Sequence, residues 1–400
     1  MTHDLVPLGD VASIIRGVTF KPDDVVSLDM ERAVACMRTK NVQHELDISD
    51  VWGISEDLVK RDDQYLVDGD VLVSSANSWN LVGKCCAVPT LPWRSTFGGF
   101  VSVLRPDRRK IDPRYLFRWF ASDRIQTTVR SFGQQTTNIS NLNIDRCLRL
   151  LLPLPPITEQ RRIAEIMDEA DALRDRRRAA LAQLDDLTRS IFLEMFGDPA
   201  SNSKHWQSVT LGQVAEVITG FPFPSVRYVS MARGIRLCRG ANVLPGRVNW
   251  SDLACWPADD VSKYDVFRLD AGDIVLAMDR PWIAGGFKIA RIRPSDIPAL
   301  LVQRVARIRG NSGICNEFLF HLLRHPFFAS HCRPTETTIP HISPIELKSF
   351  TFPCPPYDLQ QIFAHKASLL EKISAGHESA LSMLDTLFAS LQHRAFRGEL

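Results

Sequence analysis

Apolar side chains recur at alternating steps of three and four from Ile163 to Ile191, with Arg177 as the one polar residue in the series. This spacing is typical of the apolar seam of a coiled-coil helix. Three prolines just upstream keep the chain extended, Thr158 is a suitable N-cap, and Gly197 favours an end of the helix. The pattern predicts a helix of about 40 residues, which is too exposed to be stable without a partner helix.

The C-terminal segment repeats this pattern 200 residues later. The proline-rich start at Pro153–Pro156 returns at Pro353–Pro356, and His377 takes the place of Arg177 in the apolar series. Asp358 is placed to cap the second helix. Two unrelated amphipathic helices would not share these positions, so the sequence favours a duplicated unit in which the second long helix is the partner of the first.

The segments that precede the two helices also match each other. Leu8-Gly9, Gly69-Asp70 and Ile139-Ser140 recur 203 residues later as Leu211-Gly212, Gly272-Asp273 and Ile342-Ser343. The loops between these points differ, since residues 74–80 face residues 277–284 and residues 133–138 face the threonine-rich 335–338. Matching scaffold positions with different loops between them are what we expect of two binding heads, which are domains that bind different targets.

Short elements in the first half indicate a mixed head. Asp68-Gly69-Asp70 predicts a turn, residues 71–73 and 100–104 predict strands, and residues 113–121 predict a helix. The predicted fold class is α+β, with an internal duplication of two heads separated by two long α-helices. We expect four segments, which are the first head (1–152), the first long helix (153–199), the second head (200–352) and the second long helix (353–400).

Composition fits a large folded protein and excludes few functions. The chain has 400 residues, of which 45% are hydrophobic, and no apolar run approaches the roughly 20 residues of a membrane span. The first residues lack the features of a signal peptide, so a cytoplasmic protein without a membrane partner is expected. Nine scattered cysteines without a C-x-x-C pair favour reduced thiols. The net charge of +2 does not by itself indicate a nucleic-acid partner.

Catalytic motifs are weak, so neither an enzyme nor a cofactor is expected. No Gly-Lys-Ser/Thr phosphate-binding loop occurs. Cys354-Pro355-Pro356-Tyr357 resembles a methyltransferase motif, but the cysteine side chain has no carbonyl that could accept a hydrogen bond from an adenine amino group. The start of a helix explains the prolines. His321 and His325 have zinc-ligand spacing, yet Leu322 stands where a metalloprotease has glutamate, which favours solvated helix histidines and no metal. The arginines between positions 174 and 178 fit a solvated helix face with salt bridges to the partner helix.

Polar residues in the rewritten loops are the candidates for binding. Asparagine and glutamine pair bidentately with base edges, and arginine and lysine bind guanine or phosphate. The candidate DNA-binding residues are Ser75, Asn77, Asn80, Lys84, Gln134, Gln135, Thr136, Thr137 and Asn138 in the first head and Arg239, Arg280, Trp282, Lys288, Thr337 and Thr338 in the second.

The whole chain resembles the DNA specificity subunits of type I restriction-modification systems. The most specific parts of the resemblance are Pro153–Arg161, with its Pro-Leu-Pro-Pro and Glu-Gln-Arg motifs, and Phe396–Leu400 at the C-terminus. It implies two target-recognition domains that each bind one half of a split double-stranded DNA sequence, and two antiparallel spacer helices that act as a ruler. It also implies a non-catalytic subunit that docks two methyltransferase subunits, with translocase-nuclease subunits added for cleavage. Tyr357-Asp358-Leu359 departs from the usual start of the second helix.

Two other interpretations are compatible with parts of the pattern. A non-catalytic coiled-coil scaffold whose two heads bind protein partners would keep the same architecture, but its affinity would not fall steeply with salt as DNA binding does. A stand-alone methyltransferase would need a cofactor-binding βα motif, which the sequence does not show.

Overall fold

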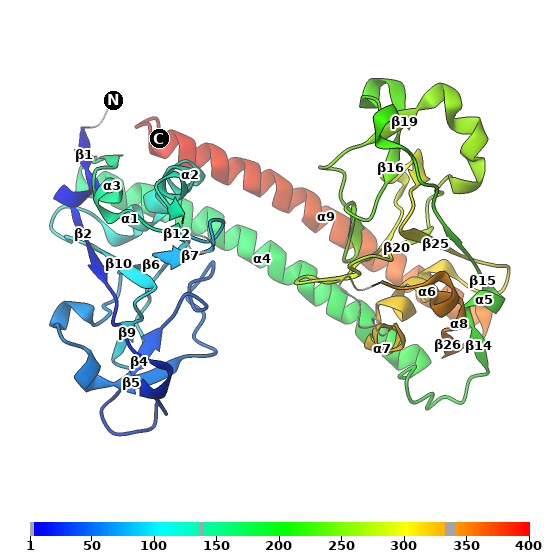
Figure 1. Cartoon of the computed structure of the whole chain (residues 1–400), viewed down its shortest axis with the longest axis horizontal. Coiled ribbons are helices and arrows are strands. Elements are labelled where there is room, and N and C mark those ends of the chain that lie inside the picture. Colours follow the sequence, from blue (N-terminus) through cyan, green and yellow to red (C-terminus); the bar gives the residue numbers. More distant parts are fainter. Residues whose placement is uncertain (1–3, 136–139, 333–340) are drawn as a thin grey trace. The chain divides into compact units, whose positions relative to one another are not determined.

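Two long helices, α4 (Ile157–Phe196, 40 residues) and α9 (Tyr357–Ala395, 39 residues), are the longest elements of the computed structural model (Figure 1). The structure describes residues 4–135, 140–332 and 341–400. Both helices begin directly after their prolines, because the carbonyls of Pro156 and Pro356 already accept helical bonds from the residues four positions on. The expected capping by Thr158 and Asp358 is therefore wrong, since both lie inside the first turn.

Contacts divide the chain into two units. One contains Met1–Arg178 and Ser379–Leu400, and the other contains Ala179–Glu378. Each unit therefore holds one head of strands and short helices together with one half of α4 and one half of α9. The predicted α+β fold class with two long helices is confirmed. Within the described residues, no helix combines the length and the apolar character that a bilayer crossing requires.

The halves of α4 and α9 run antiparallel in the first unit. Arg174 of α4 forms an ion pair with Asp385 of α9 at 2.7 Å. Ile163, earlier in α4, shares a buried cluster with Ala395, later in α9. In the second unit the ring centroids of Phe192 and Phe363 lie 5.5 Å apart. Seam residues such as Ile163 and Ala170 thus bury their apolar surface against the partner helix and the adjoining head, which supplies the stability that a lone helix lacks. Leu173 and Leu187 of the same series stay about half exposed.

The first head is built on an antiparallel sheet in the order β2-β10-β6-β8 and on a second sheet in the order β3-β5-β4-β9. Val103 of β10 lies opposite Ile15 and Leu72, and all three are buried. The elements are β1 (Leu5–Pro7), β2 (Ala12–Arg16), β3 (Val25–Val26), β4 (Ala33–Met37), β5 (Trp52–Ser55), β6 (Val71–Ser74), β7 (Ala76–Asn77), β8 (Cys85–Ala87), β9 (Ser95–Phe97), β10 (Val101–Pro106), α1 (Pro113–Phe120), α2 (Asp123–Ser131), β11 (Gln134–Gln135), β12 (Ser140–Asn141), α3 (Ile144–Leu148) and β13 (Leu151–Pro153).

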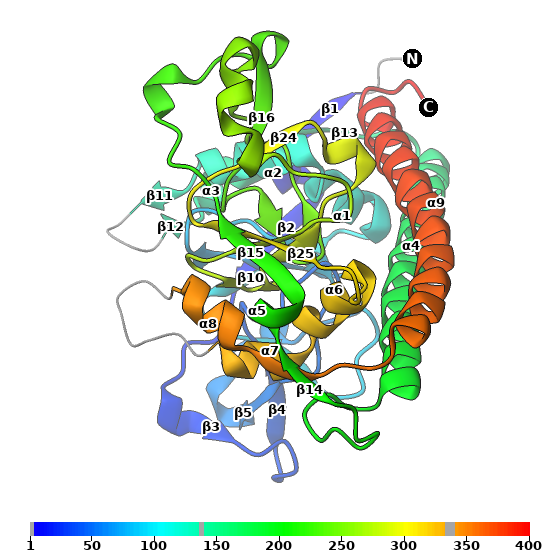
Figure 2. The ribbon, with the colours of Figure 1, turned by 90° about the vertical axis from the view of Figure 1, so that its right-hand side faces the viewer.

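The second head repeats this plan, with sheets in the orders β15-β25-β20-β23 and β19-β16-β24. Figure 2 labels the paired strands β15 and β25, and β16 and β24, of this head. The elements are β14 (Ser208–Thr210), α5 (Leu211–Val214), β15 (Ala215–Thr219), β16 (Gly234–Cys238), β17 (Val243–Leu244), β18 (Arg247–Val248), β19 (Cys255–Pro257), β20 (Ile274–Ala277), β21 (Trp282–Ile283), β22 (Gly286–Phe287), β23 (Ile289–Arg291), β24 (Ala299–Leu301), β25 (Val305–Gly310), α6 (Asn316–Arg324), α7 (Pro326–His331), α8 (Pro344–Ser349) and β26 (Thr351–Pro353).

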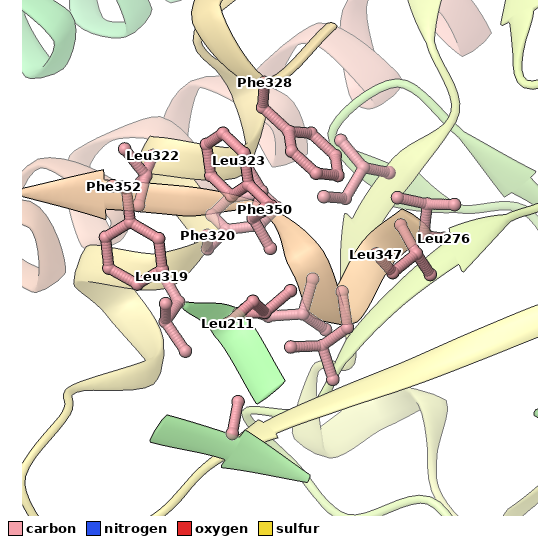
Figure 3. Close-up of a cluster of buried hydrophobic side chains, with 14 of the residues drawn as sticks. Leu211, Leu276, Leu319, Phe320, Leu322, Leu323, Phe328, Leu347, Phe350 and Phe352 are labelled. Carbon is pink, nitrogen blue, oxygen red and sulfur yellow. The ribbon is translucent and has the colours of Figure 1, made fainter. Parts of the chain in front are cut away.

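A dense aromatic core joins the second head to the start of α9. Figure 3 shows Phe350 and Phe352, from the segment that leads into α9, among leucines and phenylalanines of the head. The ring centroids of Phe328 and Phe350 lie 4.8 Å apart in an edge-on arrangement. Because aromatic side chains bury large apolar areas, this packing fixes the start of the long helix against its head.

The two heads share side-chain bonds as well as strand order. Arg105 donates from Nε and Nη2 to the buried carboxylate of Asp70, at 2.8 and 2.7 Å. Arg309 makes the same two bonds to buried Asp273, at 2.6 and 2.7 Å. A buried carboxylate is costly unless it is paired, so a kept arginine at each site is a structural requirement of the shared frame.

One detail of the sequence match is wrong by three residues. The N–H of Ile342 donates to the carbonyl of Met278, as the N–H of Leu142 donates to the carbonyl of Ser75. Ile342 is therefore the counterpart of Leu142 and not of Ile139. The residues that follow each of them, Ser343 and Asn143, cap the short helices α8 and α3.

Candidate functional site

A small sheet brings together the two polar segments of the first head. Gln135 in β11 pairs with Ser140 in β12, and Ser140 pairs in turn with Asn77 in β7. Gln134 lies opposite Asn141 on the same ladder. Candidate residues that are far apart in the sequence thus share one three-stranded edge of the head, because β12 lies between the other two strands.

The described polar side chains at this edge and in the turn after β7 differ in exposure. The amide of Asn77 donates to Ser74 Oγ at 3.1 Å and is half-buried, whereas Asn80 is exposed in the turn that follows. Lys84 is occupied within the head, since its Nζ donates to Gln43 Oε1 at 2.5 Å. The described side chains of β7 and β12 therefore offer the amide groups of Asn77 and the exposed Asn141, which suit base edges better than phosphates.

An exposed aromatic residue at this edge was missed by the sequence analysis. Phe100 lies just before β10, and its carbonyl accepts the N–H groups of Ser75 and Ala76 at 2.9 and 3.2 Å. Its side chain remains 65% exposed. The Gly98-Gly99 pair that precedes it was the available sequence signal, but the pattern predicts a strand over residues 100–104 and gave no sign that Phe100 is exposed.

The corresponding corner of the second head, formed by residues 278–280 and Arg304, is charged. The carbonyl of Arg304 accepts the N–H of Met278, as the Phe100 carbonyl accepts the N–H of Ser75. The side chain of Asp279 accepts from Arg304 Nη1 at 3.4 Å and lies 2.5 Å from His341 Nδ1. Arg280 is exposed beside this group, and among the described residues it forms no ion pair. Asp279 and Arg304 therefore form a polar surface next to the exposed guanidinium of Arg280.

Two other candidates of the second head, Trp282 and Lys288, hold the fold. Trp282 lies in the β21-β22 hairpin with its ring centroid 5.0 Å from that of Phe287 and packs on the core. Lys288 is buried and donates to the carbonyl of Gly240, and burial lowers the pKa of its ammonium group. A buried ammonium with a backbone partner is poorly placed to meet a phosphate.

Arg239 also belongs to the shared frame. Its Nη2 donates to the carbonyl of Asp252 at 2.6 Å, and the Arg239 N–H donates to Asn242 Oδ1 at 3.1 Å. Arg38 makes the same bonds in the first head, with the carbonyl of Asp50 at 2.9 Å and with Asn41 Oδ1 at 2.8 Å. A residue with the same bonds in both heads does not distinguish their targets.

Five candidates lie outside the described residues. They are Thr136, Thr137, Asn138, Thr337 and Thr338. The side chains of Gln134 and Gln135 are likewise outside the description, although their backbone pairing is part of it.

The histidines that showed zinc-ligand spacing have structural surroundings. Burial lowers the pKa of His321 to about 3, and its ring packs edge-on to Phe363 with centroids 5.1 Å apart. The Nδ1 atom of His325 accepts the N–H of Phe327 and caps α7. The expectation of a solvated side chain is therefore wrong for His321, which a helix with apolar neighbours on both sides could have indicated.

One group of possible metal ligands occurs among the described residues, formed by His44, Asp171 and Asp175. Arg118 and Arg174 each lie 2.6 Å from a carboxylate oxygen of Asp171. Burial raises the pKa of Asp171, but these arginines more than offset it and the net pKa is lowered. The negative charge that a cation would need is already neutralised.

Known proteins are similar to this chain in sequence and in fold. Residues 3–183 match the family model described as the type I restriction modification DNA specificity domain. The chain is 36% identical to the EcoAI specificity subunit of Escherichia coli over 39% of this chain and 26% of that protein. It is 24% identical to the MjaVIII specificity subunit of Methanocaldococcus jannaschii over 92% and 86% of the two chains. The EcoKI specificity subunit of Escherichia coli strain K12 is 22% identical over 99% and 89%.

Two solved structures have a similar fold. The crystal structure of the type I restriction-modification S subunit from M. genitalium matches with a TM-score of 0.57 and 13% identity, over 98% of this chain and 96% of that one. A chain from a structure described as the basis of complex assembly and conformational transition of the type I R-M system matches with a TM-score of 0.50 and 16% identity, over 100% and 98%.

Proposed function

Since the chain belongs to the DNA specificity subunits of type I restriction-modification systems, we propose that each of its heads reads one half of a split double-stranded DNA site. The observation that carries this proposal is the pair of equivalent corners, with Phe100 beside amides in one head and Arg304 beside Asp279 in the other. The frame below both corners is the same, down to the buried carboxylates of Asp70 and Asp273 with their arginine partners. Different side chains on one frame serve two different sequences.

The candidate DNA-binding residues are proposed to differ in role. We assign base contacts in the first head to Asn77, Asn80, Gln134 and Gln135, together with Ser75 and residues 136–138. In the second head we assign contacts to Arg280, with Thr337 and Thr338. Lys84, Trp282, Lys288 and Arg239 hold these surfaces in place through the contacts described above. The four-part division at residues 153, 200 and 353 remains a prediction.

The helices are proposed to set the gap and to dock two methyltransferase subunits. Leu173 and Leu387 are each about half exposed and lie one and two residues from the ion pair of Arg174 with Asp385. The repeat places Ile373 and Leu187, with similar exposure, at the corresponding positions of the second unit. Two equivalent apolar patches favour two copies of one partner. Translocase-nuclease subunits would join this assembly for cleavage.

The subunit is proposed to supply recognition and no chemistry. Its buried thiols are poor nucleophiles, since burial raises the pKa of Cys86 to about 12 and that of Cys238 to about 12. A nucleophilic cysteine needs a lowered pKa and access to solvent. Methyl transfer would then belong to the partner subunits.

Methylation mapping tests this function. A strain that carries this chain and its methyltransferase subunit should show one modified motif of two half-sites separated by a fixed gap. Removal of the chain should abolish the modification. DNA affinity of the purified complex should also fall steeply with salt, because arginine and lysine contacts release counterions. Methylation without a split motif, or binding that does not respond to salt, would contradict the proposal and favour a protein-binding scaffold.

A further inference from the structure

Phe100 is an exposed apolar side chain whose backbone is bonded to the start of the polar segment 75–80. It is 65% exposed, and Trp79 in the neighbouring turn is 51% exposed. Single exposed apolar residues are common on proteins. Here, however, Trp79 stands between Asn77 and Asn80 in the sequence, and the Phe100 carbonyl is bonded to the residue directly before Asn77; asparagine amides suit base edges.

The backbone beneath Phe100 is tightly held. The carbonyl of Gly98 accepts the N–H of Val101 at 2.8 Å and closes the turn. A Cβ atom at Gly98 would lie 3.3 Å from the ring of Phe20, and one at Gly99 would lie 3.2 Å from Thr19 Oγ1. Because the Phe100 carbonyl accepts the N–H groups of Ser75 and Ala76 at the start of β7, the ring is presented from a fixed support. Ordering it on binding therefore costs little backbone entropy.

The second head carries a different chemistry at this position. Arg304, the counterpart of Phe100, is an exposed cation within 3.4 Å of Asp279. Exposed arginine can bind base edges or phosphates through hydrogen bonds, whereas a phenylalanine can only make apolar and stacking contacts. The corner thus varies between the heads while its backbone bonds stay the same.

We propose that Phe100 is a specificity-determining residue that inserts between two base pairs of the first half-site. The inference rests on the proposed function, in which the first head binds duplex DNA. Apolar wedges partly unstack base steps, and flexible pyrimidine-purine steps yield most easily. An enzyme partner that modifies a base must also take that base out of the stack, so a local loss of stacking assists it. Phe100 thereby selects deformable steps without a hydrogen bond.

The test uses the complex of the full chain with its methyltransferase subunits. A duplex that carries the mapped motif receives 2-aminopurine at each step of the first half-site in turn. Apart from the base that the methyltransferase takes out of the stack, the wild-type complex should raise the fluorescence at one step, and Phe100→Ala should abolish that rise and weaken cognate binding roughly 10- to 100-fold. Phe100→Trp should restore both, because a flat ring is retained. Affinity for unrelated duplex should be unchanged.

Met30→Ala is the matched control, since Met30 is 57% exposed in the turn between β3 and β4 of the same head. It should leave fluorescence and affinity unchanged, and equal melting temperatures should show that all variants fold. A folded Phe100→Ala complex with normal fluorescence and affinity would overturn the wedge alone. A wild-type complex that fails to bind the duplex would overturn the proposed function together with it.

Discussion

Gln160 and Gln360 make the same pair of hydrogen bonds at the start of the two long helices. In each case Oε1 accepts a backbone N–H at 2.8 Å, from Asp112 for Gln160 and from Cys315 for Gln360. Each Nε2 donates at 2.8 Å to the carbonyl of the proline five residues upstream. Both side chains are buried. The N-cap residue of a head helix is thereby tied to the start of a long helix in each unit.

Gln160→Leu should therefore lower the free energy of unfolding by roughly 2–4 kcal/mol, because a backbone donor and a backbone acceptor are left buried without a partner. Gln360→Leu should act similarly in the second unit. Differential scanning calorimetry measures the change. The control is Gln183→Leu, at an exposed position of the same helix as Gln160, which should change little. An unchanged melting profile for Gln160→Leu would show that the amide does not join head and helix.

His321 should make the second unit sensitive to acid. Burial lowers the pKa of this histidine to about 3, so between pH 6.5 and about 3 the unfolded state binds a proton that the folded state does not. The histidine thus favours unfolding as the pH falls, by about 1.4 kcal/mol per pH unit within that window.

His321→Gln removes this group, and stability should then depend less on pH below 6.5, as measured by melting temperatures from pH 7.5 to 4.5. His365→Gln, at an exposed position of α9 in the same unit, is the control. If both variants kept the wild-type slope, proton uptake at His321 would not contribute to acid unfolding.

Arg280 and Arg239 should behave in opposite ways when each is replaced by alanine. Arg280 is exposed, so its loss should weaken DNA binding by roughly 1–3 kcal/mol and leave the melting temperature unchanged. Arg239 is bonded to Asp252, so its loss should cost about 1–3 kcal/mol of stability and leave the recognised motif unchanged. Arg38→Ala, the counterpart of Arg239 in the first head, is the control for a scaffold role. A changed motif in Arg239→Ala would place that residue on the DNA.

Paired glutamates on one helix patch should remove one partner subunit. Leu173→Glu with Leu387→Glu places charges on an apolar contact in the first unit, and Ile373→Glu with Leu187→Glu does so in the second. Native mass spectrometry should show one methyltransferase subunit in place of two for either pair, and none for all four changes. Val67→Glu, at an exposed apolar position of the first head, should retain two. Retention of two copies by the quadruple variant would exclude these patches as docking sites.

Longer helices should lengthen the gap between half-sites. Four residues inserted after Ala179 and four after Ser379 add about 6 Å to each helix at 1.5 Å per residue and keep the seam nearly in register. Base pairs rise about 3.4 Å each, so the gap should grow by one or two base pairs while both half-sites stay the same. Methylation mapping reads this directly. Four residues inserted after Ser201, in the connection between α4 and β14, should leave the gap unchanged.

Local rules made the long helices and the duplication readable from the sequence. Proline excludes a helix interior, and the seam from Ile163 to Ile191 has a period that only a helix can bury on one side. These signals need no knowledge of distant residues. The first helix accordingly begins within one residue of the expected Thr158 and ends beside Gly197, whose φ of 79° suits glycine.

Tertiary structure decided which candidate residues can meet a target. Gln135 reaches the edge of Asn77 only because β12 pairs with both strands, and Arg239 is a scaffold residue only because it repeats the bonds of Arg38. Phe100 reads as part of an apolar strand, yet a tight turn leaves its ring exposed. Burial and pairing depend on residues brought together from distant parts of the chain, and insertions between the repeats shift their numbering. The helix period is carried by neighbouring residues, whereas the binding surface exists only after folding.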